Sequence, residues 1–124
     1  MTAIEERDFQ TFADITIRDS NQFHAICQDT FPPCVYMNQT SHAVSSLVHQ
    51  LNEYFGENVA CYTFDAGPNA CLFLLEKVRH KIKGCQLMFC NSFLFFSMLV
   101  SSHPCWNISS VMVVQISLEA TSLI

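Results

Sequence analysis

The sequence predicts an α+β fold in which helices pack on a small antiparallel sheet, followed by an apolar tail of atypical composition. Apolar residues recur at helical spacing in 4–18 and again in 41–55. Two short runs rich in β-branched and aromatic residues, 58–64 and 70–75, flank a segment dense in turn residues. The last third of the chain is apolar and nearly uncharged, unlike the surface of a small domain.

The N-terminal region is expected to form two helices. The apolar positions in 4–18 fall at i, i+3 and i+4, as on one face of a helix. Asp19 and Ser20 are good N-cap residues, so they are expected to end this helix and begin a second, short one, with Phe23, Ile26 and Cys27 on one face. The segment 31–33, Phe-Pro-Pro, ends the second helix because proline cannot continue a helix and its predecessor prefers extended geometry.

The segment 41–55 gives the clearest helical signal. Thr40 or Ser41 is suited to cap its start, and Gly56 follows where a left-handed residue is wanted. Its apolar stripe follows the spacing of one buried helix face: Val44, Leu47, Val48, Leu51 and Phe55.

The two strands are expected to form a hairpin. The turn at 65–69, Asp-Ala-Gly-Pro-Asn, joins the strand 58–64 to the strand 70–75. The second strand is apolar throughout, which predicts burial on both faces. The Ile- and Val-rich segment 108–118 is a candidate for a further strand.

A change of character near residue 76 predicts a folded part, 1–76, and an atypical apolar tail, 77–124. The basic group at 77–83 is interpreted as a solvated face, and it leads into the apolar segment 85–100. That segment is shorter than the roughly 20 residues that a membrane helix usually needs. It leaves open a membrane-associated protein as one alternative.

Composition excludes several classes of function. A net charge of −5 with six Lys and Arg residues argues against nucleic acid, which needs clustered cations. The seven cysteines form no C-x-x-C pair, so no metal site is expected in this chain. The charged start of the chain is unlike a secretory signal peptide. We therefore expect a cytoplasmic protein with reduced thiols.

Several sequence blocks occur in the order and spacing of one enzyme family. They are ERDF at 6–9, DSNQFHA at 19–25, DTFPP at 29–33, YMN at 36–38 and YTFDAGPNA at 62–70. Over roughly 4–75 the chain resembles diphosphomevalonate decarboxylase, of the GHMP kinase superfamily. The resemblance implies part of the C-terminal α+β domain of that fold.

The resemblance also implies an activity and a site. The family uses ATP and Mg²⁺ to decarboxylate mevalonate 5-diphosphate to isopentenyl diphosphate, and it forms homodimers. The catalytic aspartate of the family lies in the D-A-G-P-N turn, which here makes it Asp65, with a substrate loop formed by Ala66, Gly67, Pro68 and Asn69. A further matched block suggests that Ser20, Asn21 and His24 lie on the side of the active site.

Simpler interpretations exist for these residues. An aspartate that opens a Gly-Pro turn often only stabilises the turn, and His24 is as compatible with a structural role as with a functional one. His42 and His49 are expected at solvated helix positions. A carboxylate is too weak a base for early deprotonation of a tertiary alcohol, but a loose phosphoryl-transfer transition state permits late proton transfer to Asp65.

The chain departs from the family in what it lacks. A phosphate-binding loop needs clustered glycines at a helix N-terminus, whereas the three glycines, Gly56, Gly67 and Gly84, are scattered. We therefore expect a fragment without the ATP loop that is inactive alone. The other function considered is a non-catalytic module that pairs with the full-length enzyme.

Overall fold

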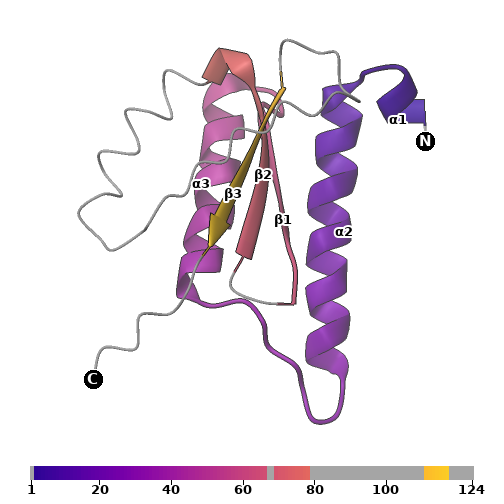
Figure 1. Cartoon of the computed structure of the whole chain (residues 1–124), viewed down its shortest axis with the longest axis vertical. Coiled ribbons are helices and arrows are strands. Elements are labelled where there is room, and N and C mark those ends of the chain that lie inside the picture. Colours follow the sequence, from indigo (N-terminus) through magenta and orange to yellow (C-terminus); the bar gives the residue numbers. More distant parts are fainter. Residues whose placement is uncertain (1, 67–68, 79–110, 118–124) are drawn as a thin grey trace.

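Helices and an antiparallel sheet make up the fold in the computed structural model, which describes residues 2–66, 69–78 and 111–117. This confirms the predicted α+β class. The order along the chain is α1 (Thr2–Glu5), α2 (Phe9–Asp29), α3 (Gln39–Phe55), β1 (Ala60–Phe64), β2 (Asn69–Leu75), the 3₁₀ turn η1 (Glu76–Val78) and β3 (Val111–Ser117). Figure 1 shows β2 between β1 and β3, with α2 alongside β1 and α3 behind the sheet.

The helix α2 is continuous, so the predicted break at Asp19 and Ser20 was wrong. It begins after Asp8, whose carboxylate accepts hydrogen bonds from the backbone N–H groups of Gln10 and Thr11. Ser20 does not act as a cap because its hydroxyl bonds to the backbone of β1 instead. The predicted end of the helix is confirmed, because α2 stops at Asp29, just before the two prolines.

The helix α3 confirms the second helical prediction with an earlier start. Asn38 is the cap in place of Thr40 or Ser41, and its side chain accepts a 2.9 Å bond from the Ser41 N–H. The Ser41 hydroxyl in turn accepts a bond from the Asn38 N–H, which completes a capping box. Gly56 ends the helix with φ +69°, as predicted.

The predicted hairpin is present and the candidate third strand extends it. In the β1–β2 pair, Tyr62 lies opposite Leu72. The strand β3 pairs antiparallel with β2 over its whole length, so residues beyond 76 contribute to the same sheet. The division of the chain at residue 76 stays a prediction, and the segment 85–100 lies outside the described residues. Within the part of the chain that the structure describes, no helix is long and apolar enough to cross a bilayer.

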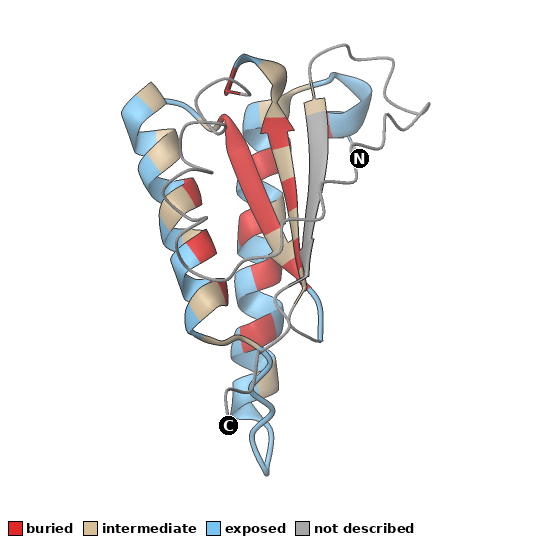
Figure 2. Cartoon of the chain, turned by 60° about the vertical axis from the view of Figure 1, so that its left-hand side comes forward, coloured by how far each residue is buried: buried red, intermediate tan, exposed pale blue. Residues whose placement is uncertain are grey.

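The core lies between the sheet and the helices, where Figure 2 shows the buried residues gathered. Along β2 burial alternates between buried and half-buried positions, so the predicted burial on both faces was wrong. The buried face carries Leu72, opposite Tyr62, whose hydroxyl bonds to His49 of α3, while Phe73 on the half-buried face packs against Phe12 of α2. Large members of the core are Ile17, Val44, Val48, Val59, Tyr62, Phe64, Leu72, Leu74 and Val78.

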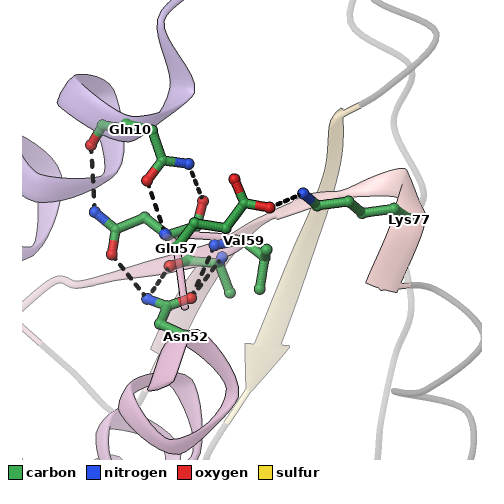
Figure 3. Close-up of polar contacts among 7 residues, drawn as sticks. Gln10, Asn52, Glu57, Val59 and Lys77 are labelled. Atoms are coloured by element: carbon green, nitrogen blue, oxygen red, sulfur yellow. Dashed lines mark hydrogen bonds and ion pairs between the residues drawn. The ribbon is translucent and has the colours of Figure 1, made fainter. Parts of the chain in front are cut away.

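Side-chain amides bond to the backbone where β1 begins (Figure 3). Asn52 Oδ1 accepts hydrogen bonds from the N–H groups of Val59 and Ala60, at 2.9 and 3.0 Å, and Asn52 Nδ2 donates to the Ala60 carbonyl at 2.9 Å. Gln10 bonds both the N–H and the C=O of Asn58. These amides occupy backbone groups that a neighbouring strand would otherwise pair with. Nearby, Lys77 forms an ion pair with Glu57.

Candidate active site

A hollow of about 400 Å³ lies between the second half of α2 and the end of β1. One wall is helical and the other is the strand with the first residues of the turn that follows it. Its lining is Asp19, Ser20, Gln22, Phe23, Ile26, Thr63, Phe64, Asp65 and Ala66. We call this hollow the Asp65 groove.

Asp65 follows the last residue of β1, and its side chain is exposed at the groove. Ala66 is exposed beside it, and Asn69 begins β2. Gly67 and Pro68 lie outside the described residues. The structure therefore brings Asp65 and Ala66 of the predicted loop into one groove with Ser20 from α2. The catalytic role of Asp65 stays a prediction.

Ser20 and His24 both bond to the backbone of Phe64, the residue before Asp65. The Ser20 hydroxyl accepts a 3.1 Å bond from the Phe64 N–H, and His24 Nε2 lies 3.1 Å from the Phe64 carbonyl oxygen. Because a carbonyl oxygen can only accept, His24 carries its hydrogen on Nε2. Both side chains are buried, with 2% and 4% exposed. Ser20 lines the groove, whereas His24 is not among the lining residues.

Asn21 contacts the strand rather than the groove. The Tyr62 hydroxyl donates to Asn21 Oδ1 at 3.1 Å, and His49 Nε2 lies 3.2 Å from the same hydroxyl. Since the single tyrosine hydrogen goes to Asn21, His49 donates to the tyrosine oxygen. His42 and His49 are exposed, as expected, although His49 has this partner.

Sequence reasoning placed Phe23 and Ile26 on one face of a short second helix and did not identify them as the apolar wall of the groove. Their side chains are 46% and 61% exposed, and both line the groove. With α2 continuous, Asp19, Phe23 and Ile26 stand at i, i+4 and i+7 and share one helix face. That spacing was the available signal, and the false helix break concealed it.

The described residues do not fit ATP or its metal ion. The charged lining of the groove is Asp19 and Asp65, and carboxylates repel phosphate. Across residues 2–66, 69–78 and 111–117, no group of three His, Cys, Asp or Glu side chains is placed to hold a metal ion. Of the basic group, Lys77 is paired with Glu57, and 79–83 lie outside the described residues.

Comparison with known proteins gives consistent matches. Diphosphomevalonate decarboxylase of Schizosaccharomyces pombe is 59% identical over 76 residues, which are 61% of this chain and 19% of that protein. The Saccharomyces cerevisiae enzyme of that name is 46% identical over 105 residues, 85% of this chain and 24% of that protein. A crystal structure of mevalonate 5-diphosphate decarboxylase superposes with a TM-score of 0.63 at 33% identity, covering 94% of this chain and 36% of the other. Mevalonate diphosphate decarboxylase from Trypanosoma brucei superposes with a TM-score of 0.65 at 36% identity, covering 69% and 23%.

The chain thus spans about a fifth to a quarter of the length of these curated relatives. The family model for the C-terminal domain of mevalonate 5-diphosphate decarboxylase matches residues 1–118. The match continues beyond the folded part predicted from the sequence and includes β3. This chain belongs to the mevalonate 5-diphosphate decarboxylase C-terminal domain family.

Proposed function

We propose that this chain supplies the aspartate side of the active site of a diphosphomevalonate decarboxylase. The reaction is the ATP-dependent conversion of mevalonate 5-diphosphate to isopentenyl diphosphate. The observation that carries the proposal is the placement of Asp65, exposed at a groove and attached to a strand whose backbone is held by α2. Membership of the family and the names of the relatives support the same assignment.

The surroundings of Asp65 suit a role as proton acceptor. Its carboxylate accepts a hydrogen bond from the tertiary hydroxyl of the substrate, orients the oxygen and takes the proton late in the phosphoryl transfer. Phe23 and Ile26 form an apolar wall beside it, and this wall excludes water from one side of the bound substrate.

The ATP and Mg²⁺ sites, in this proposal, lie in the part of the longer enzyme that this chain does not match. The chain alone is therefore inactive. The homodimer that the family resemblance implies and the cytoplasmic location expected from the sequence belong to the same proposal. Size-exclusion chromatography of the assembled enzyme tests the dimer, and cell fractionation tests the location.

The decisive experiment uses a chimaera: the Schizosaccharomyces pombe enzyme with its matching segment replaced by residues 4–75 of this chain. Asp65→Asn should lower turnover by about 10²- to 10⁴-fold, the usual contribution of a positioned proton acceptor. Binding of ATP should change less than about twofold, because the proposal places the ATP site in the part of the enzyme that this chain does not match. Asp29→Asn is the matched control, since Asp29 is an exposed carboxylate at the end of α2 and outside the groove. Retained turnover in Asp65→Asn would remove this residue from the mechanism.

A further inference from the structure

Ser20 and His24 form a clamp on a single backbone position. The polar groups of Phe64 that face α2 lie on the outer edge of β1, the first strand of the sheet. Such groups normally bond to water or attract another strand. Here one turn of α2 supplies a hydroxyl for the N–H and an imidazole N–H for the carbonyl, each at 3.1 Å.

The clamp uses most of the buried polar side chains that the structure describes. These are Ser20, His24 and Ser41. Ser41 completes the cap of α3, so its burial has a local explanation. The other two serve one residue at the far end of β1 from the amides of Gln10 and Asn52, which already anchor the start of the strand.

We infer that Ser20 and His24 are positioning residues for Asp65, an inference that rests on the proposed function. The carbonyl of Phe64 and the N–H of Asp65 belong to one planar peptide unit. The bond to that carbonyl therefore fixes the peptide plane that carries the Asp65 Cα, and the bond to the Phe64 N–H fixes the preceding peptide plane. The remaining freedom of the Asp65 carboxylate is rotation about the backbone and side-chain torsions of Asp65 itself.

The support is stiff on both sides. The imidazole of His24 packs edge-on near the rings of Phe23, Phe64 and Tyr36, with centroids 5.1, 6.3 and 6.4 Å away. Phe64 is also the last residue of β1 with a partner in the hairpin, Ala70. The pairing of β1 with β2 ends here, so the clamp holds the last paired residue, which leads directly to Asp65. A misplacement of about 1 Å can cost a catalyst about 10²-fold.

The test uses the same chimaera, with kcat and KM measured separately. His24→Leu removes the donor and should lower kcat by about 10- to 100-fold, with KM for mevalonate 5-diphosphate and ATP changed less than about threefold. His24→Gln carries an N–H at a similar reach and should restore most of kcat. Ser20→Ala should lower kcat in the same way, and Ser20→Thr should restore it. Tyr62→Phe is the control, because it weakens the same helix–strand interface without touching the Phe64 backbone.

Each outcome separates the clamp from Asp65 itself. If Asp65→Asn abolishes turnover while Ser20→Ala and His24→Leu keep the kcat of the parent, the clamp is overturned and the proposed function stands. If Asp65→Asn keeps turnover, the proposed function fails first. Equal loss of kcat in His24→Gln and His24→Leu, or in Tyr62→Phe, would mean that packing rather than the donated bond matters. Should His24→Leu not fold, the comparison of Ser20→Ala with Ser20→Thr decides. In the full chain, Ser20→Ala should also speed hydrogen exchange of the Phe64 amide at least about tenfold.

Discussion

Replacing Asn52 with alanine removes the side chain that pairs with the backbone at the start of β1. Its amide makes three bonds of 2.9–3.0 Å to Val59 and Ala60, and both residues are fully buried. The variant leaves two N–H groups and one carbonyl without these partners. An unsatisfied buried backbone group costs about 1–3 kcal/mol. We therefore expect the free energy of unfolding to fall by about 4 kcal/mol, a large part of the stability of a small domain.

The measurement is urea unfolding of the purified chain followed by circular dichroism. With a slope of about 2 kcal/mol per molar urea, the midpoint should fall by about 2 M. Asn52→Asp keeps the acceptor for both N–H groups but places a carboxylate oxygen against the Ala60 carbonyl, so it should lose about half as much. Gln50→Ala, an exposed amide on the same helix, is the control and should change little. Equal small losses in Asn52→Ala and Gln50→Ala would refute the reasoning, because they would mean that water satisfies these groups.

Two further predictions concern backbone strain and a buried thiol. Gly56→Ala should lower the free energy of unfolding by about 1 kcal/mol through its left-handed φ of +69° alone, since no atom lies within 4 Å of the added Cβ. Arg7→Gly, at φ +56°, should raise the free energy of unfolding by about 0.5 kcal/mol. Thermal melts should therefore shift in opposite directions in the two variants, and shifts in the same direction would contradict the strain argument. Burial raises the pKa of the Cys61 thiol to about 12, so the unfolded chain releases this proton above about pH 8.5 while the folded chain keeps it. The stability from this group is thus intact below about pH 8.5 and falls by about 1.4 kcal/mol per pH unit between about pH 8.5 and pH 12. The difference between the urea midpoints at pH 7.5 and pH 10 should be smaller in Cys61→Ala than in the parent chain. An equal difference in the two proteins would count against a role for the Cys61 thiol in the pH dependence of stability.

Local patterns in the sequence were enough to predict α3 and the hairpin. The stripe from Val44 to Phe55 and the stop at Gly56 depend on residues a few positions apart, and so does the turn between β1 and β2. The cap of α3 moved from the expected serine or threonine to Asn38, because Ser41 fits equally well as the third residue of a capping box.

Non-local bonds explain what the sequence did not predict. Ser20 looked like a cap, but its hydroxyl is used by Phe64, which lies 44 positions away in the chain. The groove therefore depends on α2 passing Ser20 without a break and lying along β1, and no local pattern reports that. Asp65 was singled out through its family motif, whereas Phe23 and Ile26 became visible as a wall only with the path of the helix known.

The helix side chains along β1 also affect how the sheet is assembled. Because helix groups bond to the outer edge at both ends of β1, new strands can be added only on the side of β2. The spatial order β1-β2-β3 is the order of synthesis, so each strand finds its neighbour already present as it leaves the ribosome. The helices that close the first edge are made before the strand they cover. This order limits the time during which β1 is exposed to pairing with another chain.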